Sequence, residues 1–385
     1  MHNGTHRILQ LLDERSFIAM GQLVENSGVV AGYGTINGRF VYTYSQEGQI
    51  CLAGAHKIKR AYEGALKTGV PVVGILDSAG INFEDERGLL EALGFIYTIQ
   101  SEASGVIPQF SVILGPGTGC SSFIAGFSDF VITHGSTGAE DIAHFIENNE
   151  QDCVTLARNL LSYVPANHMD DPLALLCNDD LNRKSECLNT ILDDESTPLM
   201  DTVINELVDK GSFLAQKSNN AANIKAGFGR MGGHSVGFIA NDGNFTIASV
   251  DKILRFVQFC DAFHIPIVTL TDANTYDALE ADLGSWVRPG AELIHAFVNA
   301  TVPKVNVVIR NTAPNLYFMM NSKFIGADMV FAWPGANVSA TDADDVIEPA
   351  LTRKHILSAL EMLSSKRIVR RFKKHSGLSF FDGSN

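Results

Sequence analysis

The stretch "LGPGTGCSSF", residues 114–123, places three glycines and a proline between a predicted strand and a predicted helix. No lysine follows the glycines, although a P-loop needs one to reach the terminal phosphates. No serine stands between glycines at the spacing of a nucleophile elbow. Two interpretations remain: a tight turn between strand and helix, or a row of backbone N–H groups that binds a small oxyanion.

Loops of this kind occur in pairs. "DSAGINFE" (77–84) accompanies "GPGTGC" (115–120), and "DANTYDAL" (272–279) accompanies "NTAPNL" (311–316). Each loop follows a short, mainly apolar run that we interpret as a buried strand. Ligands of α/β folds bind at the ends of such strands. Two loops that each contribute one N–H donor would form an oxyanion hole.

The paired loops belong to an internal duplication with an offset of 195 residues. A shared register across many elements indicates a repeated fold rather than chance similarity. With a shift of one residue, "LLDERSF" (11–17) also matches "LVDKGSF" (207–213). The matching positions are Gly34 and Gly229, Gly38 and Gly233, Lys57 and Lys252, Arg60 and Arg255, Pro71 and Pro266, Asp77 and Asp272, and Pro108 and Pro303.

Each copy shows the same order of predicted elements. Two β-rich runs precede a helix (53–68 and 249–264), a buried strand, a second helix (87–104 and 286–300), another buried strand and a third helix. A Rossmann domain would need G-x-G-x-x-G in its first βα turn, and this motif is absent. The order instead predicts an α/β fold in which ββα units form a spiral.

Length and composition are consistent with two domains, which we place at residues 1–190 and 191–385. The net charge of −14 argues against a nucleic-acid or anionic-membrane partner. The six cysteines form no C-x-x-C pair, so we expect neither a zinc site nor a disulfide framework. No segment has the apolar length that spans a bilayer. These features predict a cytoplasmic protein without metal or membrane insertion.

Several segments together resemble the carboxyltransferase subunits of biotin-dependent acyl-CoA carboxylases and decarboxylases, the propionyl-CoA carboxylase β subunit above all. The resemblance runs from about residue 8 to residue 367. The segments that carry it are "GVVAGYGTINGRFVYTYSQ", "KTGVPVVGILDSAG", "SGVIPQFSVILGPGTG", "DKGSF", "FVQFCDAFHIPIVTLTD", "ATVPKVNVVIR" and "DADDVIEPALTRKHILSALEMLSSKR".

The resemblance implies a duplicated crotonase-like fold. The first half would bind an acyl-CoA, and the second half would receive carboxybiotin from a biotin carboxyl carrier protein that a biotin carboxylase has charged. Active sites would lie where the first half of one subunit faces the second half of another, usually in a hexamer. We therefore expect a homo-oligomer, or a hetero-oligomer with another carboxyltransferase.

The resemblance also implies which residues act, because the thioester and biotin both become enolates whose oxygens need N–H donors. In the first half it points to Ala79 and Gly80 together with Gly119 and Cys120. In the second half it points to a biotin-binding set. That set comprises Asn274, Thr275, Asn315 and Leu316.

The sequence departs from the family pattern in both halves. The family's S-G-G-A is Ser78-Ala79-Gly80-Ile81 here, and a β-carbon on Cys120 would crowd a thioester. In place of the Gly-Gly of the second loop stand Pro314 and Asn315, and proline has no N–H to donate. Family segments that follow "FSDFVITHG" and "FAWPGANVSA" are missing, at equivalent places in the two copies.

Three functions follow from these observations. The first is carboxyl transfer between carboxybiotin and a small acyl-CoA. The second is a noncatalytic paralogue that partners a full-length carboxyltransferase, as Pro314 and the missing segments would suit. The third is a biotin-independent acyl-CoA decarboxylase that uses the first oxyanion hole alone. Among the remaining polar residues, His134, His144 and His234 could lie near a pocket, but we expect them to be solvated or packed. Lys57, Lys59 and Arg60 could meet the phosphates of coenzyme A, but we expect them to lie on a solvated helix face.

Overall fold

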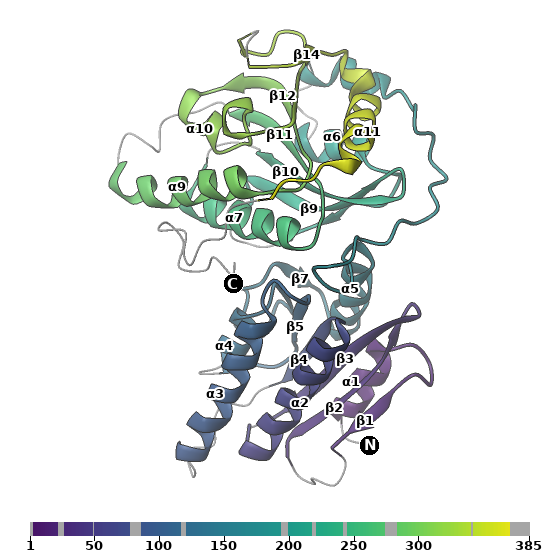
Figure 1. Ribbon diagram of the computed structural model, residues 1–385, viewed down its shortest axis with the longest axis vertical. Coiled ribbons are helices and arrows are strands. Elements are labelled where there is room, and N and C mark those ends of the chain that lie inside the picture. The colour runs from purple at the N-terminus through teal and green to yellow at the C-terminus, as the bar shows by residue number, and fades with distance from the viewer. Residues whose placement is uncertain are drawn as a thin grey trace. The chain divides into compact units, whose positions relative to one another are not determined.

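The computed structural model describes residues 3–21, 27–48, 50–77, 86–116, 121–193, 199–217, 221–241, 245–273, 283–339 and 342–369. The chain divides into two compact units (Figure 1). Unit 1 contains residues 1–171 together with Lys217, and unit 2 contains most of the remainder, from Pro172 onward. Segment 172–190, which the sequence assigns to the first domain, thus lies in unit 2.

Unit 1 consists of a sheet with helices on its faces. Its helices are α1 (Asn3–Leu11), α2 (Leu52–Thr68), α3 (Glu86–Ala103), α4 (Ser121–Gly126) and α5 (Glu150–Tyr163). Its strands are β1 (Ile18–Met20), β2 (Val29–Ile36), β3 (Arg39–Glu47), β4 (Val72–Asp77), β5 (Gln109–Ile113), β6 (Phe130–His134) and β7 (Phe145–Glu147). The described strands pair in chain order, antiparallel from β1 to β3 and parallel from β3 to β7.

Unit 2 repeats this plan. Its helices are α6 (Leu199–Leu207), α7 (Ile247–Ala262), α9 (Leu283–Asn299), α10 (Pro314–Phe318) and α11 (Thr352–Met362). Its strands are β8 (Leu214–Ala215), β9 (Ile224–Met231), β10 (His234–Asn241), β11 (Ile267–Ala273), β12 (Lys304–Thr312), β13 (Met329–Ala332) and β14 (Asp345–Val346). These strands also pair in chain order. The 3₁₀ turns of the unit are Glu186–Asn189, Ile191–Asp193, Lys323–Ile325, Pro349–Leu351 and Leu363–Ser365.

The predicted duplication is confirmed element by element. β9 begins and ends 195 residues after β2, at Ile224 and Met231 against Val29 and Ile36. The helices α2 and α7 and the strands β4 and β11 begin at the same offset. The predicted order of two strands, helix, strand, helix and strand therefore holds in both halves.

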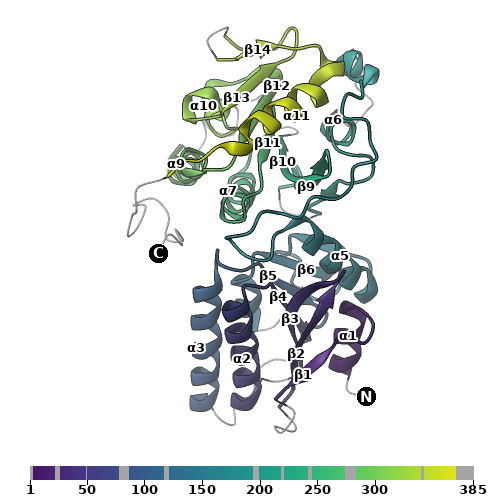
Figure 2. The same cartoon turned by 45° about the vertical axis from the view of Figure 1, so that its right-hand side comes forward.

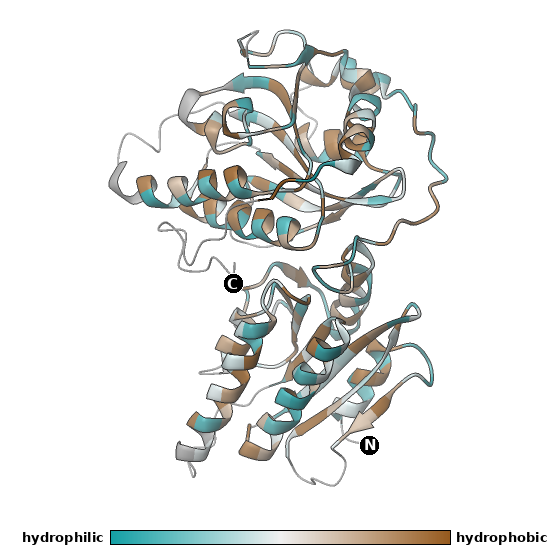
Figure 3. Cartoon of the chain, in the orientation of Figure 1, coloured by the Kyte–Doolittle hydropathy of each residue, from teal (hydrophilic) through white to brown (hydrophobic). Residues whose placement is uncertain are grey.

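Each unit has its own hydrophobic core. In unit 1 the helices α2 and α3 lie side by side against one face of the sheet (Figure 2), and Ile58 of α2 and Ile96 of α3 are fully buried in the core of this unit. The strand β4 is buried up to Leu76, which explains its apolar run, and β5 is buried throughout, including the polar Gln109 and Ser111. Helices α2 and α9 alternate hydrophilic and hydrophobic residues along their visible faces (Figure 3), because one side of each helix meets solvent.

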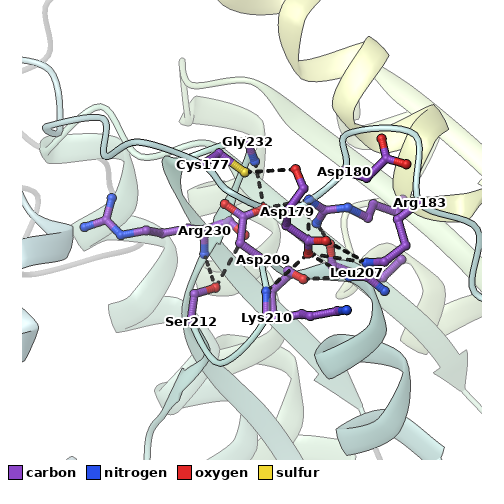
Figure 4. Close-up of polar contacts among 12 residues, drawn as sticks. Cys177, Asp179, Asp180, Arg183, Leu207, Asp209, Lys210, Ser212, Arg230 and Gly232 are labelled. Carbon is purple, nitrogen blue, oxygen red and sulfur yellow. Dashed lines mark hydrogen bonds and ion pairs between the residues drawn. The ribbon is translucent and has the colours of Figure 1, made fainter.

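The repeated motif of "LLDERSF" and "LVDKGSF" forms a clamp on a β-hairpin. In unit 2, Asp209 accepts hydrogen bonds from the amides of Gly232 (3.0 Å) and Gly233 (2.7 Å) in the β9–β10 turn (Figure 4). Arg353 of α11 is buried, pairs with Asp209 at 2.6 Å and donates to the carbonyl of Leu207. The clamp therefore joins the last helix of the unit to its first hairpin.

Unit 1 contains the same clamp. Asp13 accepts from the amides of Asn37 (3.0 Å) and Gly38 (2.9 Å), and Arg158 of α5 pairs with Asp13 at 2.8 Å and donates to the carbonyl of Leu11 at 2.5 Å. Burial alone would raise the pKa of Asp13, but the Gly38 amide and the Arg158 guanidinium outweigh burial and lower it well below its usual range. The presence of this motif in both halves is thus explained by folding rather than by catalysis.

The same cluster holds segment 172–190 in unit 2. Arg183 pairs with Asp179 (3.1 Å) and Glu206 (3.1 Å) and donates to the carbonyl of Val208 (Figure 4). Asp179 also accepts from the amide of Lys210 at 3.3 Å. A tertiary network of charges, which local sequence patterns do not reveal, therefore places this segment.

Candidate active site at the strand ends

In unit 1 two neighbouring parallel strands end side by side. β4 and β5 pair from Val72 with Gln109 to Leu76 with Ile113. The chain leaves β4 after Asp77 and enters residues 78–85, and after β5 it enters the loop that leads to α4. Both loops thus begin at one edge of the sheet, as the sequence predicts.

The residues expected to supply the first oxyanion hole fall in these two loops. Ala79, Gly80, Gly119 and Cys120 all lie outside the described residues. Their assignment therefore stays a prediction, supported by the strand ends on either side of them.

Asp77, the last residue of β4, forms an ion pair with a buried arginine. Arg7 of α1 is 3% exposed and donates from Nη1 to Asp77 Oδ2 at 2.6 Å. Its Nη2 pairs with Glu150 at 2.7 Å. Burial alone would lower the pKa of Arg7, but hydrogen bonds to Glu150 and Asp77 outweigh burial and raise it. A β-carbon on Gly115 would lie 1.9 Å from Asp77 Oδ1, so the first residues of the second loop are packed against this carboxylate.

Asp272 stands at the equivalent point of unit 2, and its cation comes from a different element. Arg310 of β12 donates from Nε (2.8 Å) and Nη2 (2.6 Å) to Asp272 Oδ2. Asn241 of β10 accepts from the amide of Asp272 at 2.9 Å and donates to its carbonyl. The Asp272 side chain is 5% exposed, so the end of β11 is fixed on both sides.

The second-half residues implied by the resemblance divide into two groups. Asn274 and Thr275 lie outside the described residues. Asn315 and Leu316 lie in the first turn of α10, which Pro314 begins. The first bond within this helix runs from the Tyr317 amide to the Ala313 carbonyl, at 2.9 Å. First-turn amides have no acceptor within their own helix, so Asn315 and Leu316 each bring such an N–H to the end of β12, and Pro314 brings none.

Other polar residues singled out in the sequence have structural roles. Lys57 donates to the carbonyl of Val29 at 3.1 Å, and Lys252 donates to that of Ile224 at 2.8 Å, so the repeat preserves this contact. The expectation that Lys57 lies on a solvated face is therefore corrected: both lysines donate a hydrogen bond to the first carbonyl of a strand, β2 or β9. Lys59 lies over the ring of Phe95 at 4.7 Å.

The three histidines are also accounted for. His134 contacts the carbonyl of Leu114 through Nε2 (3.2 Å) and Ser136 through Nδ1 (2.9 Å). His144 accepts from the amide of Val131 at 3.1 Å, and His234 is exposed at the start of β10. Within the described part of the chain, no three His, Cys, Asp or Glu side chains gather as metal ligands would. The described helices include none with the length and apolar character to cross a membrane.

Sequence patterns alone do not reveal the arginines that neutralise the two aspartates. The repeat gives one indication of Arg310, because glycine, Gly115, stands at the equivalent position of the first half. Such a change in size and charge between the two copies indicates that the two strand ends are built differently. Arg7 had no such sign, since α1 reaches Asp77 only in the folded unit.

Comparison with known proteins identifies the family. The model of the carboxyl transferase domain matches residues 6–140 and 137–341. Among curated proteins, the chain is 33% identical to the methylmalonyl-CoA decarboxylase subunit alpha of Veillonella parvula, over 97% of this chain and 92% of the relative. It is 31% identical to the mitochondrial propionyl-CoA carboxylase beta chain of Homo sapiens, over 97% and 87%. The chain therefore belongs to the carboxyl transferase domain family.

Solved structures agree with this assignment. Transcarboxylase 12S, described as a hexamer with hydrolysed methylmalonyl-coenzyme A bound, superposes with a TM-score of 0.92 at 28% identity, over 97% of this chain and 92% of that one. A single-chain long-chain acyl-CoA carboxylase shares the fold, with a TM-score of 0.77 at 18% identity, over 92% of this chain and 45% of that one. These carboxyltransferases confirm the predicted duplicated crotonase-like fold.

The chain is shorter than its relatives within the matched region. Its alignment with the Veillonella parvula subunit spans 467 positions, whereas the chain has 385 residues, so at least 82 aligned positions have no counterpart here. The connections that the sequence predicts to be shortened are β6 to β7, residues 135–144, and β13 to β14, residues 333–344.

Proposed function

We propose that this protein transfers a carboxyl group between carboxybiotin, carried on a separate protein, and a small acyl-CoA. Membership of the carboxyl transferase domain family carries the proposal. Relatives named methylmalonyl-CoA decarboxylase and propionyl-CoA carboxylase support short acyl groups as the first substrates. The duplicated fold supports a reaction with two partners, since each half offers one pair of strand ends.

In the first half, amides of Ala79 or Gly80 and of Gly119 or Cys120 would hold the thioester oxygen. The α-carbon becomes nucleophilic when its proton leaves, and the negative charge then collects on that oxygen. Preorganised N–H donors stabilise such charge, and the loss of one donor typically costs about 2.7–4 kcal/mol. Arg7 and Asp77 would hold the root of one loop, and the packing of Gly115 the root of the other.

In the second half, two of the first three residues of α10 would offer an N–H to the biotin carbonyl, and Pro314 offers none. The amides of Asn315 and Leu316 remain as donors in the first turn of α10, and Asn274 and Thr275 would supply the partner loop. Carboxybiotin supplies the carboxyl group and, after its loss, a base for the α-proton. The task of this chain is to orient the ureido oxygen, to exclude water and to keep the two substrates close together.

We infer that a complete active site needs more than one subunit. The proposal places acyl-CoA on the first half of one copy and biotin on the second half of another, in a homo-oligomer or with a second carboxyltransferase chain. A biotin carboxyl carrier protein and a biotin carboxylase would be the remaining partners. Transcarboxylase 12S is described as a hexameric core of a multienzyme, which supports this arrangement.

A noncatalytic partner subunit is the second candidate. Pro314 at the first position of α10 favours it, because the loop there has one N–H fewer than a glycine would give. The missing positions of the shortened chain favour it as well. In that role the protein would assemble with a full-length carboxyltransferase and would not turn over by itself.

Isotope transfer separates these functions. The purified chain would be incubated with ¹⁴C-carboxybiotin on its carrier and with acetyl- or propionyl-CoA. Label in the acyl-CoA supports carboxyl transfer. Unlabelled acyl-CoA together with capture of another carboxyltransferase subunit supports the partner role. Loss of CO2 from malonyl-CoA without any biotin would instead indicate a biotin-independent decarboxylase.

A further inference from the structure

The strand β12 contains a bulge opposite Asp272. β11 and β12 pair in register up to Thr271 with Val308, and pairing resumes at Thr312. Asp272 alone therefore faces the three residues 309–311. A bulge redirects the strand that carries it and is common beside active sites. Here the redirected strand continues, one residue beyond its end, into α10.

The bulge is held by the side chain of Asp272. Its carboxylate accepts from Nε and Nη2 of Arg310 and lies 3.4 Å from the amide of Asn311, so it contacts two of the three bulge residues. The Arg310 carbonyl accepts from the amide of Asn337 at 2.6 Å. Asn241, which is fully buried, fixes the backbone of Asp272 from the other side. Three neighbouring strands, β10, β11 and β12, are thus tied together at their ends.

The first half has a different ion pair at the corresponding strand end. β5 ends at Ile113, and the amide of Leu114 continues the ladder to the carbonyl of Leu76 at 2.8 Å; Ser78 and Gly117, the counterparts of Ala273 and Thr312, lie outside the described residues. Asp77 takes its cation from Arg7 of α1 and packs against Gly115, the position that Arg310 occupies in the second half. Gly115 has no side chain to remove, so the matching change in the first half is made at Arg7.

We propose that Asp272 and Arg310 are positioning residues of the second half. Their ion pair locks the bulge of β12, and the locked bulge sets where the first turn of α10 presents the amides of Asn315 and Leu316. The pair acts through these amides and touches no substrate. This inference rests on the proposed function, because it assigns the second half to biotin.

The test compares substitutions that separate the two halves. Arg310→Met removes the cation at similar size, and Arg310→Lys keeps the charge but loses the paired N–H fork. Arg7→Met is the matching change in the first half. Arg255→Met, which breaks an exposed pair with Asp251 on α7, is the control for loss of a surface arginine. The substrates are free carboxybiotin and propionyl-CoA, each varied in turn, and calorimetry measures the Kd of propionyl-CoA.

We expect Arg310→Met to lower kcat/KM for carboxybiotin by roughly ten- to a hundredfold, since misplacement of about 1 Å costs as much. The Kd of propionyl-CoA should stay at the wild-type value, and Arg310→Lys should recover part of the loss. Arg7→Met should instead weaken propionyl-CoA binding, and Arg255→Met should change neither quantity. Wild-type kinetics for Arg310→Met, or an equal loss for both substrates, would overturn the proposal.

A second measurement does not depend on activity. If the wild-type protein transfers no carboxyl group, the proposed function fails, and hydrogen exchange then tests the positioning role alone. Arg310→Met should speed exchange of the Tyr317 amide, which bonds to Ala313 in α10, relative to wild type and Arg255→Met. Unchanged exchange at Tyr317 in a protein with native tryptophan fluorescence would refute the locking of the bulge.

Discussion

The two hairpin clamps differ in burial, and this difference predicts unequal costs for the same substitution. The Arg353 side chain is 0% exposed and that of Asp209 12%, whereas Arg158 and Asp13 are 25% and 27% exposed. Removal of one partner from a buried pair costs about 3–5 kcal/mol, because the remaining charge stays desolvated. A partly exposed pair contributes about 1 kcal/mol or less. Arg353→Met should therefore destabilise unit 2 far more than Arg158→Met destabilises unit 1.

Tryptophan fluorescence during urea unfolding reads unit 2 selectively. The chain has two tryptophans, Trp286 and Trp333, and both lie in unit 2. Trp333 is 1% exposed and donates to Thr352, the neighbour of Arg353. With an m-value of about 2 kcal/mol/M, the midpoint of the fluorescence transition should fall by roughly 1.5–2.5 M in Arg353→Met.

Arg158→Met should leave the fluorescence midpoint unchanged and shift only the part of the circular dichroism transition that belongs to unit 1. The exposed-arginine variant Arg255→Met should stay within about 0.5 kcal/mol of wild type. A fluorescence midpoint of Arg353→Met at the wild-type urea concentration would contradict the higher cost of the buried pair. An equal shift of this midpoint in Arg158→Met would contradict it as well.

Three further predictions concern single residues. Burial raises the pKa of Asp129 from 3.8 to about 7, so the folded state binds this proton more tightly than the unfolded state does. The resulting contribution to folding stability is fully present below pH 3.8 and is lost as the pH rises through about 7. In Asp129→Asn the melting temperature should therefore fall less between pH 4 and pH 7 than it does in wild type. At pH 8 the melting temperature of the variant should be the higher of the two. Gly115→Ala should destabilise unit 1 by about 1–3 kcal/mol, because its β-carbon would overlap Asp77, whereas Gly94→Ala, with open space around it, should not destabilise the helix. Asn315→Pro removes one predicted donor and should lower the carboxyl-transfer kcat by roughly 10²–10³-fold, while Asn315→Ala keeps the amide and should lose far less; equal losses would place the effect in the side chain.

The sequence predicts the architecture well because the duplication records it twice. Glycine, proline and aspartate at a constant offset mark turns and strand ends, such as Asp77 and Asp272, and these positions follow local backbone requirements. The strand β4 appears in the sequence as a short apolar run for the same reason. Such features depend on short-range geometry, which one sequence contains in full.

Tertiary electrostatics lay beyond the sequence. Arg7 reaches Asp77 across 70 residues, and Arg353 reaches Asp209 across 144. The placement of segment 172–190 in unit 2 follows from Arg183 and its partners, although its composition resembles that of a linker. The role of Lys57 was also hidden, because a helical pattern does not show that a lysine bonds to a neighbouring strand.

The catalytic assignment depends on where main-chain N–H groups point, and a structure with bound acyl-CoA measures this directly. The account predicts that the thioester oxygen lies about 2.7–3.2 Å from one amide of Ala79 or Gly80 and one of Gly119 or Cys120. Amides of these four residues bonded instead to carbonyls of their own loops, with the acyl-CoA bound elsewhere or not at all, would contradict it.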